Sequence, residues 1–332
     1  MTLYALENVD DAIDATRSFL WPFDLGRWLK LAFVVFFLGG TGAVNPFQFG
    51  GGTSSTESPG EPGQLPSYSE IVNALTPTEW AIVGAIVGTI LLLGLILGFI
   101  GAVMEFVFVE SLRRERVSIR EYWGARWRQG VRLFGFRLVV GLLSLAVAGG
   151  AIVAALWPLF AGGQFSVAVL LLAIGVALVV AMISGLLTGF TTQFVVPVMV
   201  AEDRTVLGAW KRFWPTMTGQ WKEYLAYAVL RIVLSIAVSI LVGVVTAIGL
   251  VVLAIPLVMV GIAGGVLLSV SDIVGGAVLL VVVALFFVAV IAISLVIAVP
   301  VQTYLRYYAL LVLGDTEEAF DLVAERRRAI RE

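Results

Sequence analysis

The chain has no cysteine and no histidine, and only three of its 332 residues are lysine. Without cysteine there is no disulfide, thiolate nucleophile or iron–sulfur site, and without histidine there is no imidazole base and no histidine-ligated metal. The sequence also has no phosphate-binding loop, H-E-x-x-H pair or serine-nucleophile elbow. We therefore predict no cofactor, no metal site and no enzymatic activity.

Charge is scarce as well. Only 13% of the residues are charged and 60% are hydrophobic, whereas soluble domains have about 25% charged and about 45–50% apolar residues. This composition predicts an all-α polytopic transmembrane helix bundle that uses the bilayer as its solvent. Acidic side chains lie within a basic cluster (Glu121) or directly before one (Glu202 and Asp203), so we predict no nucleic acid partner.

The 21 lysines and arginines fall into four clusters, which run from Arg17 to Lys30, Arg113 to Arg137, Arg204 to Arg231 and Arg306 to Arg331. Basic residues concentrate on the cytoplasmic side of membrane proteins. The turns near 45–79, 161–164 and 269–276 carry no lysine or arginine, and the first and the last of them carry acidic residues. We therefore expect a multi-pass protein of the cell (plasma) membrane, with the N- and C-termini in the cytoplasm.

Long apolar runs between these clusters predict six spans, since a bilayer core of about 30 Å needs about 20 helical residues. The runs are 28–44, 80–109, 132–160, 166–200, 224–270 and 275–313. The fifth run would measure roughly 70 Å as one helix, at about 1.5 Å per residue. Pro256 or Pro300 could divide the last two runs, so eight spans is an alternative.

Two tryptophan-containing motifs suggest an internal repeat. Trp21 and Trp214 each begin the pattern W-P-x-x-x-G-x-W, and a looser copy begins at Trp123. We predict one integral membrane domain, 1–332, made of three pseudo-repeats that each combine an amphipathic interfacial helix with a membrane hairpin. The repeats cover 1–110, with a flexible outside loop over 45–77, then 111–200 and 201–313. A cytoplasmic C-terminal helix over 314–332 follows, beginning near Asp315.

Arginine and tryptophan alternate on the segments expected at the cytoplasmic surface. Tryptophan prefers the depth of the lipid headgroups, and arginine pairs with lipid phosphate. This pattern is typical of ordinary interfacial anchoring and also of a defined site for anionic headgroups. The candidate headgroup contacts are Arg126, Trp127, Arg128, Lys211, Arg212, Trp214 and Trp221.

An ionisable residue inside a membrane span costs free energy, so such residues are functional candidates by default. Arg231 lies ten residues after Trp221, roughly 15 Å along the helix axis. We predict an intramembrane polar site at Arg231, with Glu105 as its partner. A structural ion pair is the alternative use of these residues. Arg137 lies only about four residues, or about 6 Å, beyond Leu133, so its long side chain can extend to the interface.

Two resemblances add to this interpretation. Residues 11–33, DAIDATRSFLWPFDLGRWLKLAF, resemble the start of the DUF7544-type proteins, an uncharacterised haloarchaeal membrane family, and the likeness covers most of the chain. Residues 194–214, FVVPVMVAEDRTVLGAWKRFW, more distantly resemble a cytoplasmic junction in the membrane domain of some glycerophosphodiester phosphodiesterases. Their hydrolase domain has no counterpart in this sequence, so their activity is not implied.

These observations favour a non-enzymatic membrane module that organises or senses lipid, or scaffolds a protein partner. Its expected partners are membrane lipids, especially anionic headgroups. The alternative is a transporter or channel for a small solute, with a pathway that uses Arg231 and Glu105.

Overall fold

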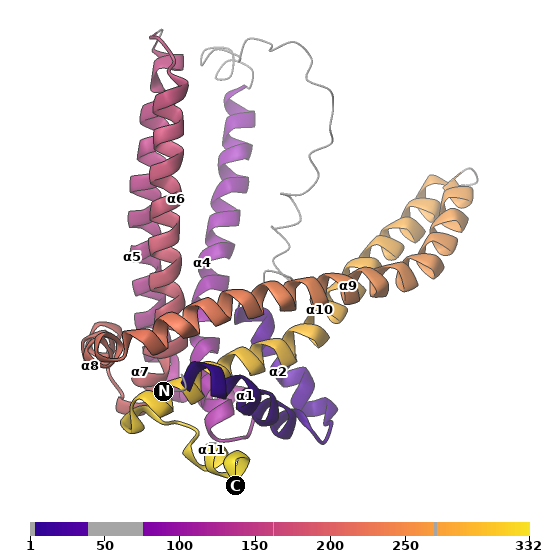
Figure 1. The fold of residues 1–332 in the computed structure, drawn as a ribbon. Helices are drawn as coiled ribbons and strands as arrows, with labels where there is room; N and C mark the ends of the chain where they lie inside the picture. Colours follow the sequence, from indigo (N-terminus) through magenta and orange to yellow (C-terminus); the bar gives the residue numbers. More distant parts are fainter. Residues whose placement is uncertain (1–3, 39–75, 162, 269–270) are drawn as a thin grey trace. The chain divides into compact units, whose positions relative to one another are not determined.

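The computed structural model describes residues 4–38, 76–161, 163–268 and 271–332, and these residues form helices joined by short connections, with no strand among them. The loop expected over 45–77 lies almost wholly outside these ranges. The helices (Figure 1) are α1 Tyr4–Leu20, α2 Leu25–Leu38, α4 Pro77–Arg113, α5 Ile119–Phe160, α6 Val167–Phe190, the π-helix η2 Thr191–Val195, α7 Val196–Glu202, α8 Val206–Gly219, α9 Trp221–Leu268, α10 Asp272–Thr316, the 3₁₀ turn η3 Glu318–Phe320 and α11 Ala324–Arg331.

Five helical stretches in the described ranges are long and apolar enough to cross a membrane: α4, α5, the α6–η2–α7 stretch, α9 and α10. They correspond to the second to sixth predicted spans. The first predicted span, 28–44, begins within α2, but residues 39–44 lie outside the described residues. For the described residues, the predicted all-helical fold with long apolar helices is confirmed, whereas the count of six spans stays a prediction.

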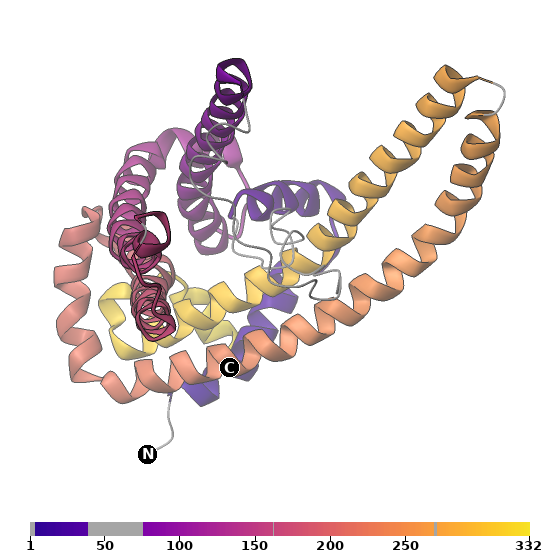
Figure 2. The same cartoon turned by 90° about the horizontal axis from the view of Figure 1, so that it is seen from above.

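Neither of the two longest apolar runs is divided. α9 has 48 residues with Pro256 inside it, and α10 has 45 residues with Pro300 inside it. At about 1.5 Å per residue, α9 is roughly 70 Å long. The two helices lie side by side as a hairpin, and α9 curves along its length (Figures 1 and 2). The helix breaks that an eight-span arrangement needs are therefore not seen in α9 or α10.

The two W-P-x-x-x-G-x-W copies adopt different structures. Trp21 and Pro22 lie in the connection between α1 and α2, whereas Trp214 and Pro215 lie inside α8. In the middle copy, the segment expected at the interface continues without a break into the span of α5. The three pseudo-repeats therefore stay a prediction from the sequence.

The end of the chain differs from its prediction. α10 continues through Asp315 to Thr316, and the C-terminal helix begins at Ala324. The prediction that a surface helix begins at Asp315 was therefore wrong. An aspartate is also favourable as a partner for nearby arginines, and Asp315 has that role here.

The helices group into two compact units that do not follow the repeat boundaries. Unit 1 contains α1, α2, the end of α4 from Phe108, the end of α8 from Trp214, and α9 to α11. Unit 2 contains α4 up to Val107, α5 from Arg120, α6, η2, α7 and α8 up to Phe213. In unit 1, α1 packs against α9, α10 and α11, and α2 packs against α10.

Burial is concentrated at one end of the long helices. In unit 2, Val103, Leu133 and Val198 are fully buried, whereas Leu91 on α4 and Leu172 on α6 are more than 60% exposed. Gly130 of α5 allows close approach to Val103, because a Cβ there would collide with the Val103 side chain. The exposed halves of the helices are apolar on all sides, which is the expected surface of a segment in contact with lipid.

Candidate functional site: helix-end cations and an intramembrane ion pair

In unit 2, the exposed cations near the start of α5 and on α8 match part of the predicted headgroup set. Trp127 is 45% exposed, and the Arg128 guanidinium lies 5.8 Å from the centroid of its ring. A cation over the face of a tryptophan ring is attracted by the ring quadrupole. Lys211 on α8 is also exposed. These three side chains have the exposure that a contact with lipid headgroups requires.

Two other residues of unit 2 that were predicted to contact headgroups instead pair with side chains of the protein itself. Arg126 donates a hydrogen bond to the Gln129 side chain at 3.3 Å and lies 3.9 Å from the Asp203 carboxylate. Arg212 pairs with Glu202 at 3.4 Å. Gln129 also donates to the Met199 carbonyl and to Asp203. Arg126 and Arg212 therefore tie the start of α5 and α8 to the end of α7.

In unit 1, the predicted residues Trp214 and Trp221 are both more than half exposed. The ammonium group of Lys222 lies 6.0 Å from the centroid of the Trp221 ring. Lys222 was not among the predicted headgroup contacts. Its sequence signal was its position beside Trp221 within the third basic cluster, at the start of a long apolar run. Unit 1 therefore has an exposed cation–aromatic pair of its own, as unit 2 has in Arg128 and Trp127.

Glu105 lies in a buried polar cluster of unit 2. Its side chain is 4% exposed, and Arg137 of α5 donates a hydrogen bond to its carboxylate at 3.0 Å. The same Arg137 nitrogen donates to the Thr192 hydroxyl at 2.7 Å. The Arg137 side chain can extend to the interface by its position in the sequence, but in the structure its charged end is held beside Glu105. Sequence position alone could not distinguish these two directions of one long side chain.

Arg231, the other predicted member of the intramembrane site, lies on α9 in unit 1. It is half-buried, and its guanidinium lies near the Tyr227 hydroxyl one turn earlier. Glu105 belongs to unit 2. The pairing of Arg231 with Glu105 therefore stays a prediction.

Thr192 belongs to the π-helix η2, which interrupts the α-helical pattern between α6 and α7. Short π-helical turns are rare and occur frequently at functional sites. The preceding residue, Thr191, accepts a hydrogen bond from the Trp210 indole of α8 at 3.0 Å. Phe194 of η2 stacks on Phe213 of α8, with ring centroids 5.5 Å apart. The same five-residue turn thus contacts α8 and the Glu105–Arg137 pair.

In unit 1, an ion-pair cluster connects the two ends of the chain. Asp315 accepts hydrogen bonds from Asn8 on α1 and from Arg327 and Arg331 on α11, at 2.7–3.0 Å. Arg331 also donates to Asp11 at 2.8 Å. The hydrogen bond from Arg331 to Asp315 raises the pKa of that guanidinium, which therefore keeps its charge. We call Asn8, Asp11, Asp315, Arg327 and Arg331 the terminal cluster.

Asp321 lies beside the terminal cluster, in the connection before α11. Burial raises the pKa of its carboxyl group, and the nearby Arg327 guanidinium opposes that shift. The Arg327 guanidinium lies 2.5 Å from the Asp321 carboxylate. Arg327 thus pairs with both Asp315 and Asp321, which holds α11 against the end of α10.

Comparison with known proteins identifies the family. A family model described as a family of unknown function, DUF7544, matches residues 3–323. The chain belongs to the DUF7544 family. No curated protein and no solved structure matches the chain. The family resemblance seen at residues 11–33 is therefore confirmed over nearly the whole chain, and the family brings no assigned activity with it.

The chemistry that this DUF7544 chain offers is one of cations, aromatic rings and apolar surface. Among the residues that the structure describes, no group of three or more carboxylates is placed to hold a metal ion. Exposed guanidinium and ammonium groups beside tryptophan rings suit phosphate headgroups. The Glu105–Arg137–Thr192 cluster suits either interhelical locking or the passage of a polar solute.

Proposed function

We propose that this protein is a non-enzymatic module of the cell membrane that organises or senses lipid, or scaffolds a partner protein, with both termini in the cytoplasm. The observation that supports the proposal best is the pair of exposed cation–aromatic contacts, Arg128 with Trp127 and Lys222 with Trp221. Both lie near the N-terminal ends of helices that are apolar enough to cross a membrane. The haloarchaeal source and the phosphodiesterase-like junction at 194–214 stay predictions from the sequence.

The physical basis is the position of these side chains relative to the bilayer. Tryptophan rings settle at headgroup depth. A lysine or arginine near an anionic leaflet contributes about 1 kcal/mol of attraction, which salt screens within about 10 Å. Arg128, Lys211 and Lys222 are exposed, so each can contribute this attraction without breaking an ion pair of the fold.

The test compares two sets of charge-neutralising substitutions in the full-length protein. We expect Arg128→Gln, Lys211→Gln and Lys222→Gln together to lower the ratio of phosphatidylglycerol to phosphatidylcholine that stays bound, as measured by native mass spectrometry from mixed-lipid nanodiscs. The matched set, Arg126→Gln with Arg212→Gln, removes cations that bond internally and should lower Tm with little change in the ratio. An unchanged lipid ratio in the triple variant would exclude a headgroup role for these residues.

The rival function is transport of a small solute, and the Glu105–Arg137–Thr192 cluster is the observation that favours it. Because the native chain has no cysteine, a Thr192→Cys variant has a unique thiol. Rapid labelling of that thiol by a charged, membrane-impermeant thiosulfonate would show that water reaches the cluster and would favour transport. Protection of the thiol until the protein is unfolded would favour a sealed structural lock.

A further inference from the structure

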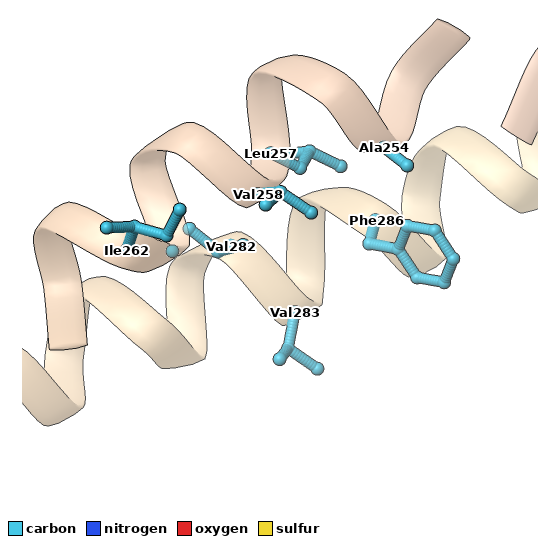
Figure 3. Close-up of a pocket in the computed structure, with 8 residues that line it drawn as sticks. Ala254, Leu257, Val258, Ile262, Val282, Val283 and Phe286 are labelled. Atoms are coloured by element: carbon cyan, nitrogen blue, oxygen red, sulfur yellow. The ribbon is translucent and has the colours of Figure 1, made fainter. Parts of the chain in front are cut away.

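The α9–α10 hairpin of unit 1 contains an apolar groove that the headgroup contacts do not explain. Its volume is about 460 Å³, within the range of about 300–1,000 Å³ that is usual for ligand sites. Side chains of both helices line it, and every side chain drawn in Figure 3 is a hydrocarbon. The lining includes Ala254, Leu257 and Val258 from α9, and Val282, Val283 and Phe286 from α10.

The two helices approach each other closely on either side of the groove. Toward the base of the hairpin, a Cβ on Gly249 would lie 3.0 Å from the Ile293 side chain. Toward the tip, a Cβ on Gly264 would lie 2.9 Å from the Val278 side chain. Between these contacts, a Cβ on Gly261 would meet no atom within 4 Å. The close contacts at Gly249 and Gly264 therefore lie on either side of the groove, and Gly261 lines it.

Pro256 gives a local reason for the groove. It lies inside α9, within the stretch that lines the groove. A proline in a helix interior removes one backbone hydrogen bond and its ring clashes with the preceding turn, so the helix bends there. A bend in one helix of a hairpin opens a gap against its partner, and α9 is visibly curved (Figure 2).

The surroundings of the groove determine what fills it. Side chains that point away from the groove, such as Val252 and Met259 on α9 and Leu280 on α10, are apolar and more than half exposed. This surface is stable only in hydrocarbon, where water is absent. An empty groove would lose dispersion contacts along both walls, and a polar ligand would find no hydrogen-bond partner among the lining side chains.

We propose that this groove is a binding site for the hydrocarbon chain of a membrane lipid, which lies along α9 and α10 between the Gly249 and Gly264 contacts. The site rests on the proposed role in organising lipid. Its test detects acyl chains rather than headgroups, so a failure of this proposal can be distinguished from a failure of the headgroup proposal.

The experiment uses the full-length protein in phosphatidylcholine nanodiscs doped with a phosphatidylcholine that carries a diazirine in the middle of one acyl chain. After irradiation, peptide mass spectrometry locates the crosslinked residues. We expect crosslinks to be enriched at Val258 and Val282 in the groove relative to Met259 and Leu280, which point away from it. Equal labelling of these two pairs of residues, as ordinary surrounding lipid would give, would overturn the proposal.

Two substitutions that fill the groove provide the second arm. Gly261→Phe should lower the groove crosslinks severalfold and leave those at Met259 unchanged, because Gly261 lines the groove and a Cβ there meets no atom within 4 Å. Gly243→Phe is the matched control, since Gly243 also has no atom within 4 Å of a Cβ and lies on the same helix outside the groove. Ala254→Leu adds a larger side chain at the other end of the groove. It replaces Gly261→Phe in this experiment if Gly261→Phe lowers Tm. Unchanged groove crosslinks in a filled variant that stays folded would also overturn the proposal.

Discussion

At the scale of single residues, Glu105 shows how an acid is accommodated in a helix that crosses a membrane. Its carboxylate is buried and bonded to Arg137, and Thr192 accepts a second hydrogen bond from the same guanidinium nitrogen. A hydrogen bond between charged groups contributes about 1.5–3 kcal/mol to stability. The cluster joins α4, α5 and η2 and is therefore the polar centre of unit 2.

A double-mutant cycle tests this contact. Glu105→Gln and Arg137→Gln should each lower the free energy of unfolding by about 1.5–3 kcal/mol. The double variant should lose less than the sum, with a coupling of about 0.5–3 kcal/mol. Denaturation in mixed detergent micelles measures these values. The exposed Arg132→Gln is the control, with an expected change within about 0.5 kcal/mol. Strictly additive effects would show that the two side chains do not interact.

Gly130 supports a second prediction at this scale. Gly130→Ala should destabilise the protein by about 1–3 kcal/mol, because its Cβ would meet both the side chain and the backbone of Val103. Gly135 lies on the same helix, and a Cβ added there meets no atom within 4 Å. Gly135→Ala should therefore stabilise the protein by up to about 1 kcal/mol through higher helix propensity. Thermal unfolding of the two variants compares them directly, and equal Tm values would contradict the packing of α4 on α5 at Gly130.

Single residues also show where sequence reasoning reached its limit. Arg126 and Arg128 are two positions apart, and the Arg/Trp pattern predicted headgroup contact for both. Arg126 bonds internally, whereas Arg128 is exposed over Trp127. The difference depends on which face of α5 packs against the end of α7, and that packing joins residues more than 70 positions apart in the chain. Composition and local spacing contain no information about such a contact.

At the scale of helices, most long spans could be predicted because their signal is local. Apolar runs of the right length gave the spans that became α4, α5, α6, α9 and α10. The π-helix could not be predicted, because Thr191 to Val195 have no local pattern that distinguishes a π-turn from an α-turn. The start of α11 was misplaced for a related reason. Asp315 suits a helix N-cap, but here it bonds with arginines that follow it in sequence.

The terminal cluster leads to a prediction about α11. Asp315→Ala removes the shared acceptor of Asn8, Arg327 and Arg331, so α11 should separate from α1 and α10. Hydrogen–deuterium exchange should become faster across residues 324–331, and high salt should produce part of the same effect in the unaltered protein. Glu325→Gln changes an exposed acid on the same helix and should leave exchange unchanged. Unaltered protection of α11 in Asp315→Ala would show that apolar packing alone holds the helix.

At the scale of the whole molecule, the arrangement of charge predicts the orientation in the membrane. Because the chain has no cysteine, single cysteines can report it. We expect a membrane-impermeant maleimide to label Gln164→Cys in intact cells and to label Asp10→Cys and Glu332→Cys only after lysis. All three positions are exposed in the structure. Labelling of Asp10→Cys or Glu332→Cys in intact cells would contradict the cytoplasmic placement of the termini.

The measurement that tests the central proposal most directly is an experimental structure in nanodiscs that contain phosphatidylcholine and phosphatidylglycerol. The proposal of a lipid-organising module predicts ordered lipid phosphate density beside the Arg128–Trp127 and Lys222–Trp221 pairs, with no water path to Glu105 or Arg231. A continuous water-filled cavity that reaches Glu105 or Arg231, with no ordered lipid at those tryptophans, would contradict it and identify a transport pathway instead.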